Sequence, residues 1–138
     1  MIAQLFEIQP SMAQTASAAG DAIDVSGFSE LLVFLHLTAG SGTLSALDIY
    51  LESSDDGGAT WYEICADTIF QSTGADGASP AATANARNLL RSTSIVTADT
   101  KVAAKYTVFG QKVRGRWLIT PTSSPSETFG IKAVGKAA

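Results

Sequence analysis

The stretch LDIYLES, residues 47–53, alternates apolar and polar side chains without a break. Leu47, Ile49 and Leu51 fall on one face of an extended chain, and polar side chains lie between them on the other face. Alternation with period two is typical of a strand that has one face in a core and one toward solvent. The stretch therefore predicts a half-buried β-strand.

The segment KVRGRWLIT, residues 112–120, has the same period. Its apolar residues Val113, Trp117 and Ile119 share a face with Gly115, so this segment also predicts a half-buried strand. The opposite face carries a basic stripe, which we take as a candidate partner interface: Lys112, Arg114 and Arg116.

The segment ELLVFLHLT, residues 30–38, is apolar on both faces. A strand of this kind is typical of the middle of a sheet that is covered on each side. It contains His36, and a histidine amid Leu and Phe is more typical of a strand residue than of a metal ligand or a base. We therefore expect a central, covered strand here.

Extended runs recur along the chain, and they predict about eight paired strands with one or two further runs unpaired. The runs are residues 2–8, 12–18, 21–25, 30–38, 46–53, 60–67, 86–91, 101–109, 112–120 and 127–134. We predict an all-β fold: one antiparallel β-sandwich, jelly-roll or immunoglobulin-like, in which residues 1–138 form a single domain.

Two segments are expected to extend from this sandwich. Residues 71–86 are rich in Gly, Ala and Ser and predict an exposed loop, within a long excursion around residues 70–100. Residues 1–20 are a candidate arm that contacts a partner.

Two parts of the chain resemble each other. FLHLT-AGSGTLSA-LDIYL and WLIT-PTSSPSET-FGIKA each place eight small or polar residues after a threonine, Thr38 or Thr120, and before an alternating strand. The equal lengths predict two strand–loop–strand units built alike. A shared way of crossing the end of a sandwich is favoured over duplication.

The net charge of −4 is unevenly distributed. Residues 1–99 hold twelve acids and two arginines, a sum of −10, and the last 39 residues hold seven bases and one acid, Glu127, a sum of +6. Two explanations stay open: complementary faces that meet copies of the chain or an acidic partner, and strands that pair the two signs across one sheet. Nucleic acid is not an expected partner, because the whole chain is acidic and its basic segment is short.

One cysteine, Cys65, excludes an internal disulfide framework and a cysteine-based zinc cluster, and it is expected to be a small buried residue. Spacing leaves a Cys65–His36 pair open, but no third residue that would orient it stands out. We predict that the chain is not an enzyme and holds no metal or cofactor. No basic leader and no run of about 18 apolar residues is present, so neither a signal peptide nor a membrane span is expected.

The alternating strand at residues 47–53 runs into SSDDGGATW, which matches S-x-D-x-G-x-T-W. The matching residues are Ser54, Asp56, Gly58, Thr60 and Trp61. In a hairpin corner the Asp accepts backbone N–H groups, Gly takes positive φ, and the indole covers the turn while its N–H finds an acceptor. Every motif residue therefore has a structural role.

This spelling resembles the Asp-box hairpin of sialidases and related β-propellers, although the chain is too short for a propeller and holds one box. In those families the hairpin lies away from the catalytic centre. A cation site at Asp55, Asp56 and Glu52 lacks the spacing of a calcium loop and is not expected. Carbohydrate contact through Trp61 or Tyr62 is a less favoured alternative.

Three segments together, DAIDVSGFSELLVFLHLTAGSG, LDIYLESSDDGGATWYEI and KVRGRWLIT followed by SETFGIKAVGK, resemble small structural proteins of tailed bacteriophages. The resemblance covers roughly residues 21–64 and 106–136. It implies a virion protein, made in the host cytoplasm, that acts as a head decoration (cement) or accessory protein on the capsid surface. The implied partners are the major capsid protein and copies of the chain, with a trimer as a natural assembly. One alternative is a tail-associated or host-surface carbohydrate-binding module with exposed aromatics at Trp61, Tyr62 or Tyr106. A second is a remnant glycosidase, which would require paired carboxylates that face each other in a cleft.

Overall fold

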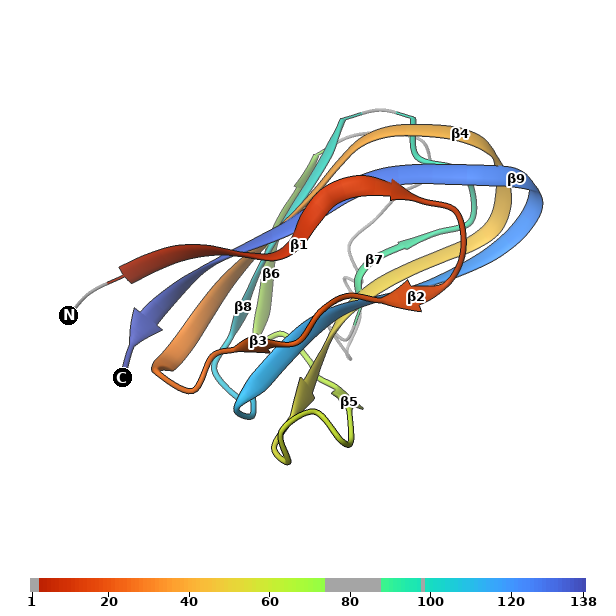
Figure 1. The fold of residues 1–138 in the computed structure, drawn as a ribbon. Coiled ribbons are helices and arrows are strands. Elements are labelled where there is room, and N and C mark those ends of the chain that lie inside the picture. Colours follow the sequence, from red (N-terminus) through yellow and green to blue (C-terminus); the bar gives the residue numbers. More distant parts are fainter. Residues whose placement is uncertain (1–2, 74–87, 98) are drawn as a thin grey trace.

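Two very long strands determine the architecture of the computed structural model, which describes residues 3–73, 88–97 and 99–138. Strand β4 (Phe28–Ser54) has 27 residues and strand β9 (Lys112–Ala137) has 26. They pair antiparallel from Phe28 opposite Ala137 to Ser54 opposite Lys112. Because strands usually have about 3–10 residues, a ribbon of this length must bend to enclose a core, and Figure 1 shows it folded back on itself.

One half of this ribbon carries a five-stranded layer. Strand β1 (Ala3–Gln14) pairs with β9, and strand β8 (Thr100–Tyr106) pairs with β4. Strand β6 (Thr68–Thr73) pairs with β8, so the order across the layer is β1-β9-β4-β8-β6. All of these pairings are antiparallel.

The other half of the ribbon carries shorter strands. Strands β2 (Ala18–Ala19) and β3 (Ile23–Asp24) pair with β9. Strands β5 (Tyr62–Glu63) and β7 (Asn88–Ser92) pair with β4. The two layers are therefore parts of one continuous sheet.

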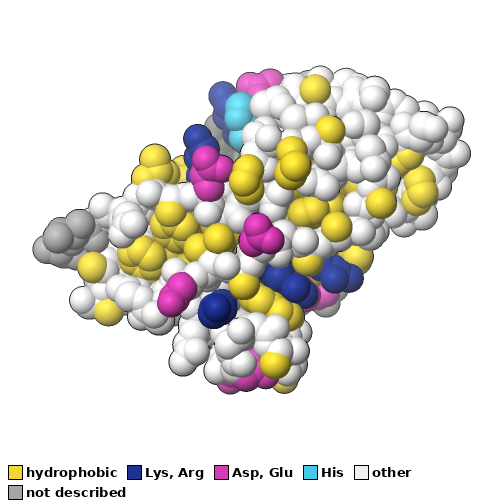
Figure 2. All heavy atoms as spheres, in the orientation of Figure 1, with side chains coloured by type: hydrophobic (Ala, Val, Ile, Leu, Met, Phe, Trp, Pro, Cys, Tyr) yellow, Lys and Arg dark blue, Asp and Glu magenta, His cyan; other side chains and the backbone are white. Residues whose placement is uncertain are grey.

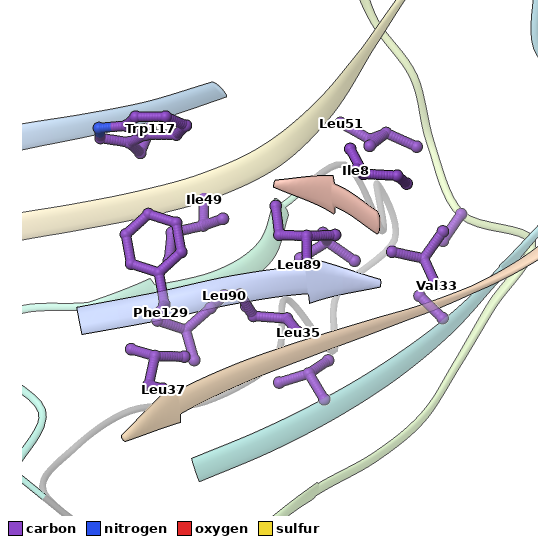
Figure 3. Packing of buried hydrophobic residues seen from close by; sticks show 14 of the residues in the cluster. Ile8, Val33, Leu35, Leu37, Ile49, Leu51, Leu89, Leu90, Trp117 and Phe129 are labelled. Carbon is purple, nitrogen blue, oxygen red and sulfur yellow. The ribbon is translucent and has the colours of Figure 1, made fainter. Parts of the chain in front are cut away.

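The core lies between the two layers. Away from the bend, alternate residues of β4 point into it, and these side chains are at most 1% exposed: Leu31, Val33, Leu35, Leu37, Leu47, Ile49 and Leu51. Figure 3 shows five of them, Val33, Leu35, Leu37, Ile49 and Leu51, together with labelled side chains of β7 and β9. Trp117 and Phe129 meet edge to face, with ring centroids 5.4 Å apart, and they come from opposite halves of the ribbon. Burial of each large aliphatic side chain stabilises the fold by roughly 1.5–3 kcal/mol.

The all-β, antiparallel prediction is confirmed, and the faces expected of residues 47–53 and 112–120 are correct. Leu47, Val113 and Ile119 are buried, and Gly115 lies on the same face, where an added Cβ would come within 2.9 Å of Ile131 Cδ1. In the part of the chain that the structure describes, no helix is long and apolar enough to cross a membrane.

The two predicted loops between strands are wrong. Residues 39–46 and 121–128 are not separate crossings; they belong to β4 and β9 and pair with each other, for example Gly40 with Glu127 and Ser41 with Ser126. Several register shifts accumulate here, because the ribbon folds over at this point. The equal lengths of the two polar stretches follow from their pairing.

The expectation of a covered strand at residues 30–38 is wrong for one face. The strand is central in its layer, but Phe34 is 38% exposed and His36 is exposed as well. Its second face is open to solvent because no described strand packs over it. We call this surface of the five-stranded layer the outer face.

The two segments expected to extend from the sandwich differ in outcome. Residues 3–14 form β1, which pairs with β9, and the contact of this segment with a partner stays a prediction. Residues 71–73 complete β6, and the rest of the predicted loop, 74–86, lies outside the described residues. Part of the excursion around residues 70–100 is the strand β7, which pairs with β4.

The bend requires glycine at position 42. Its φ is +75°, and an added Cβ would lie 2.2 Å from the carbonyl oxygen of Ser124. We predict that Gly42→Ala lowers the free energy of unfolding by roughly 2 kcal/mol or more, from backbone strain and the clash together. Denaturant titration measures this effect.

Gly27→Ala is the matched control, because nothing lies within 4 Å of an added Cβ at Gly27 and its φ is not positive. Equal stability of the two variants would contradict the role of Gly42.

Candidate functional site

The corner that follows β4 is closed by its own side chains. Asp56 Oδ1 accepts the backbone N–H of Thr60 at 2.9 Å and that of Ala59 at 3.1 Å. The Ser54 hydroxyl donates to Asp56 Oδ1 at 2.7 Å and accepts the Gly58 N–H at 2.9 Å. Gly58 has φ +100°, a conformation that L side chains avoid. These bonds fix the backbone of the corner.

The hydrogen bonds also stabilise the ionised form of Asp56. The backbone N–H of Thr60 and the hydroxyl of Ser54 lower the Asp56 pKa from its ordinary value of 3.8 to about 2. The carboxylate is thus negative over nearly the whole pH range and is occupied in bonding the corner.

Trp61 is packed against the corner. Its Nε1 donates to the carbonyl of Gly58 at 3.0 Å. The Arg114 guanidinium lies over the indole, 4.2 Å from its centroid, and its Nε bonds Glu52 at 2.8 Å. Arg114 from the basic stripe therefore joins the corner to β4.

The other two residues of the basic stripe also lie beside groups of their own chain. Lys112 is the strand neighbour of Ser54 and Asp24. The pKa of Asp24 is lowered by hydrogen bonds from Ser26 and, to a smaller extent, by the charge of Lys112. Arg116 is the strand neighbour of Tyr50, whose pKa is raised mainly by burial. The structure places the three stripe residues on one strand and brings Arg114 into the corner.

Acids of the N-terminal part and bases of the C-terminal part meet across the sheet. Glu30 on β4 pairs with Lys105 at 3.1 Å and with Lys136 at 3.8 Å. The Arg114–Glu52 contact is a third pair of this kind. Pairing of the two signs across one sheet thus accounts for part of the charge asymmetry.

The outer face holds a hollow that the sequence analysis did not identify. Its volume is about 470 Å³, and it spans β1, β9, β4 and β8. Neighbouring positions in the sheet place Phe34 between Lys132 and Ala103, and His36 between Gly130 and Lys101. Small residues beside the two rings leave the hollow open. The sequence feature that could have indicated the hollow is the pair of rings, Phe34 and His36, at alternate positions of one strand.

The rim of the hollow is charged with both signs. His36 Nε2 bonds Asp99 Oδ1, and Lys101 Nζ lies 3.5 Å from Asp99 Oδ2. The hydrogen bond with His36 lowers the pKa of Asp99. Figure 2 shows the single histidine beside basic and acidic side chains at the edge of the molecule. Lys132 and Glu7 add one charge of each sign.

An apolar row continues across the outer face next to the hollow. The strand pairings align Leu5, Val134 and Leu32 from β1 to β4. Leu5 is 65% exposed, and Val134 and Leu32 are half-buried. Together with Phe34, these residues form an apolar surface with a charged rim, which is the pattern of a protein-binding patch.

Other expected site residues are placed as follows. Cys65 is exposed, so the expectation of a buried residue is wrong. Tyr106 is fully buried, and burial raises its pKa, so its ring cannot meet a carbohydrate. Tyr62 is 61% exposed.

Across residues 3–73, 88–97 and 99–138 no group of three His, Cys, Asp or Glu could hold a metal ion. Asp55 and Asp56 therefore form no such group with Glu52.

No protein-family model and no curated protein matches this chain. Among solved structures, the chain is similar to the crystal structure of the SPBc2 prophage-derived protein YomS, with a TM-score of 0.48 and 17% sequence identity. The match covers 98% of this chain and 96% of that chain.

The lowered pKa of Asp56 predicts a pH dependence. The pKa is about 2 in the fold and 3.8 ordinarily, so the contribution of Asp56 to stability is complete above pH 3.8 and is lost as the pH falls toward 2. Asp56→Asn removes this titration. Its unfolding temperature should therefore fall less than that of the wild type between about pH 4 and pH 2.

Asp55→Asn is the matched control, because the hydrogen bonds of the corner go to Asp56. Thermal unfolding of the three proteins across this pH range measures the difference. If the unfolding temperature of Asp56→Asn fell with pH as steeply as that of the wild type, this result would contradict the lowered pKa of Asp56.

Proposed function

We propose that this chain is a structural protein of a tailed-phage virion, a decoration protein that binds the outside of the capsid and stabilises it. The observation that carries the proposal is the outer face, an exposed apolar surface around Phe34 with a rim of mixed charge. The resemblance of residues 21–64 and 106–136 to phage structural proteins supports the same role.

The geometry of the outer face suits docking onto a rigid shell. It lies on paired strands of one continuous sheet, so little conformational entropy is lost when a partner covers it. A charged rim gives orientation, and the apolar centre gives most of the binding free energy. Many weak copies of such a contact on one lattice sum to large stability.

The basic stripe has a smaller part in this proposal than the sequence indicated. Arg114 is already bound to Glu52 and Trp61, so recruiting it to a partner would break contacts within the chain. Lys132 and Lys101, on the rim of the hollow, are better placed to meet acidic groups of a capsid or of another copy of the chain, because the contact of Lys101 with Asp99 is an exposed one at 3.5 Å.

The proposal is tested by binding purified protein to heads of the encoding phage. Wild-type protein should bind in a ratio set by the lattice sites and should raise the temperature at which the heads release DNA. Phe34→Lys places a charge in the apolar centre and should weaken binding at least about tenfold. Co-sedimentation with heads measures the affinity.

Tyr62→Ser is the matched control, since Tyr62 is an exposed aromatic outside the outer face. It should bind heads as the wild type does. Loss of head binding in Tyr62→Ser with normal binding in Phe34→Lys would overturn the role of the outer face. A glycan array in which Tyr62→Ser loses the signal would favour the carbohydrate-binding alternative instead.

A further inference from the structure

Strand β1 presents an unused backbone edge. Among the residues that the structure describes, β1 pairs with β9 alone and ends the strand order of its layer. In Figure 1 it forms an edge of the sheet, with its beginning next to the end of β9. An exposed edge of this kind is a template for an added strand.

Only the second half of this edge is protected. Pro10 removes a backbone donor, and two register shifts lie between Glu7 and Gln9 and between Gln9 and Met12. Proline and bulges are the devices by which edge strands avoid pairing with other chains. An added strand would therefore lose its register beyond Glu7.

The first half is regular and apolar. Ala3 to Glu7 pair with Lys136 to Lys132 without a register shift. Leu5 is 65% exposed on the outer face, and Phe6 on the opposite face stacks on Phe28 at 5.3 Å. Figure 2 shows hydrophobic side chains gathered beside this end of the chain. No charge interrupts the edge before Glu7.

We propose that Ala3–Glu7 pairs antiparallel with the same segment of a second copy of this chain, with the two-fold axis at Leu5. The segment is self-complementary in this register. Leu5 meets the second Leu5, each Gln4 meets a Phe6, and each Glu7 meets an Ala3, so the two carboxylates do not face each other. The contact is isologous, as a closed dimer requires.

This pairing joins the outer faces of the two copies. Leu5 lies in one row with Val134 and Leu32, and the second copy continues that row in the opposite direction. The exposed Leu5 side chains then cover each other. A five-residue edge belongs to the small interfaces, below roughly 1,200 Å² of total buried area, so the dimer is weak in solution.

The dimer is measured on purified protein without capsids, so it succeeds or fails independently of the proposed function. Head binding without self-association would reject only the dimer, and self-association without head binding would reject only the decoration role.

A charge exchange at the two-fold axis tests the pairing. Leu5→Lys and Leu5→Glu each place like charges opposite one another and should weaken self-association at least about tenfold relative to the wild type. An equimolar mixture of the two variants places Lys opposite Glu and should restore dimers. Sedimentation velocity over a concentration series measures all four samples.

Met12→Lys is the matched control, because Met12 is 51% exposed on the protected half of the same strand. It should dimerise as the wild type does. Circular dichroism and unfolding temperature verify that each variant is folded. A wild type that stays monomeric throughout the series, or a mixture that stays monomeric while the wild type dimerises, would overturn the proposal.

A disulfide test requires no tight dimer. In a Cys65→Ser background, Leu5→Cys should form a covalent dimer under mild oxidation, because directly opposed residues of antiparallel strands lie within disulfide reach. Met12→Cys in the same background should not. Equal cross-linking of the two variants would contradict the register.

Discussion

The backbone pairing of β4 with β9 is the constraint on which the rest of the structure depends. It joins Phe28 to Ala137 and Ser54 to Lys112, so a single ladder runs through both layers of the sandwich. Two sheets held only by side-chain packing could slide or rotate, whereas one folded ribbon fixes the position of each layer relative to the other. Because the ladder pairs segments distant in sequence, its formation carries a large loop-closure entropy, and we expect slow folding of the kind seen in other β topologies.

Buried polar groups that need hydrogen-bond partners lie at the bend of the ribbon. Glu127, the one acid among the last 39 residues, is fully buried there, and its Oε1 accepts the N–H of Val96 at 2.7 Å. A Cβ on Gly40 would come within 2.7 Å of Glu127 Oε2, so glycine makes room for this carboxylate. A buried carboxylate is costly unless it is hydrogen-bonded. Glu127 thus ties the segment after β7 to the place where the sheet folds over.

Residue periodicity was enough to predict the strands at residues 47–53 and 112–120 and their faces, but not the open second face of residues 30–38 or how the strands connect. The alternation of Leu47, Ile49 and Leu51 is a local property, and burial follows it. The pairing of residues 39–46 with residues 121–128 is not local, because polar and small side chains look alike in a loop and in a bulged ladder. The corner was predictable because Asp56, Gly58 and Trp61 act on backbone a few positions away. The hollow was not, because it needs Lys101, Lys132 and Phe34 from three strands side by side.

The same sheet therefore separates, by face and by edge, the side chains with structural roles from the surfaces that we propose for binding. Side chains on the inner face are buried in the core, and Arg114 packs over Trp61 of the corner. Among the described residues, the outer face around Phe34 and the regular half of β1 stay available for a partner, and these two surfaces meet at Leu5. A partner that covers one changes the exposure of the other, because Leu5 is part of both. Self-association through β1 and docking through the outer face are for this reason expected to be coupled, and pairing of two copies would double the apolar surface that a flat lattice can engage at once.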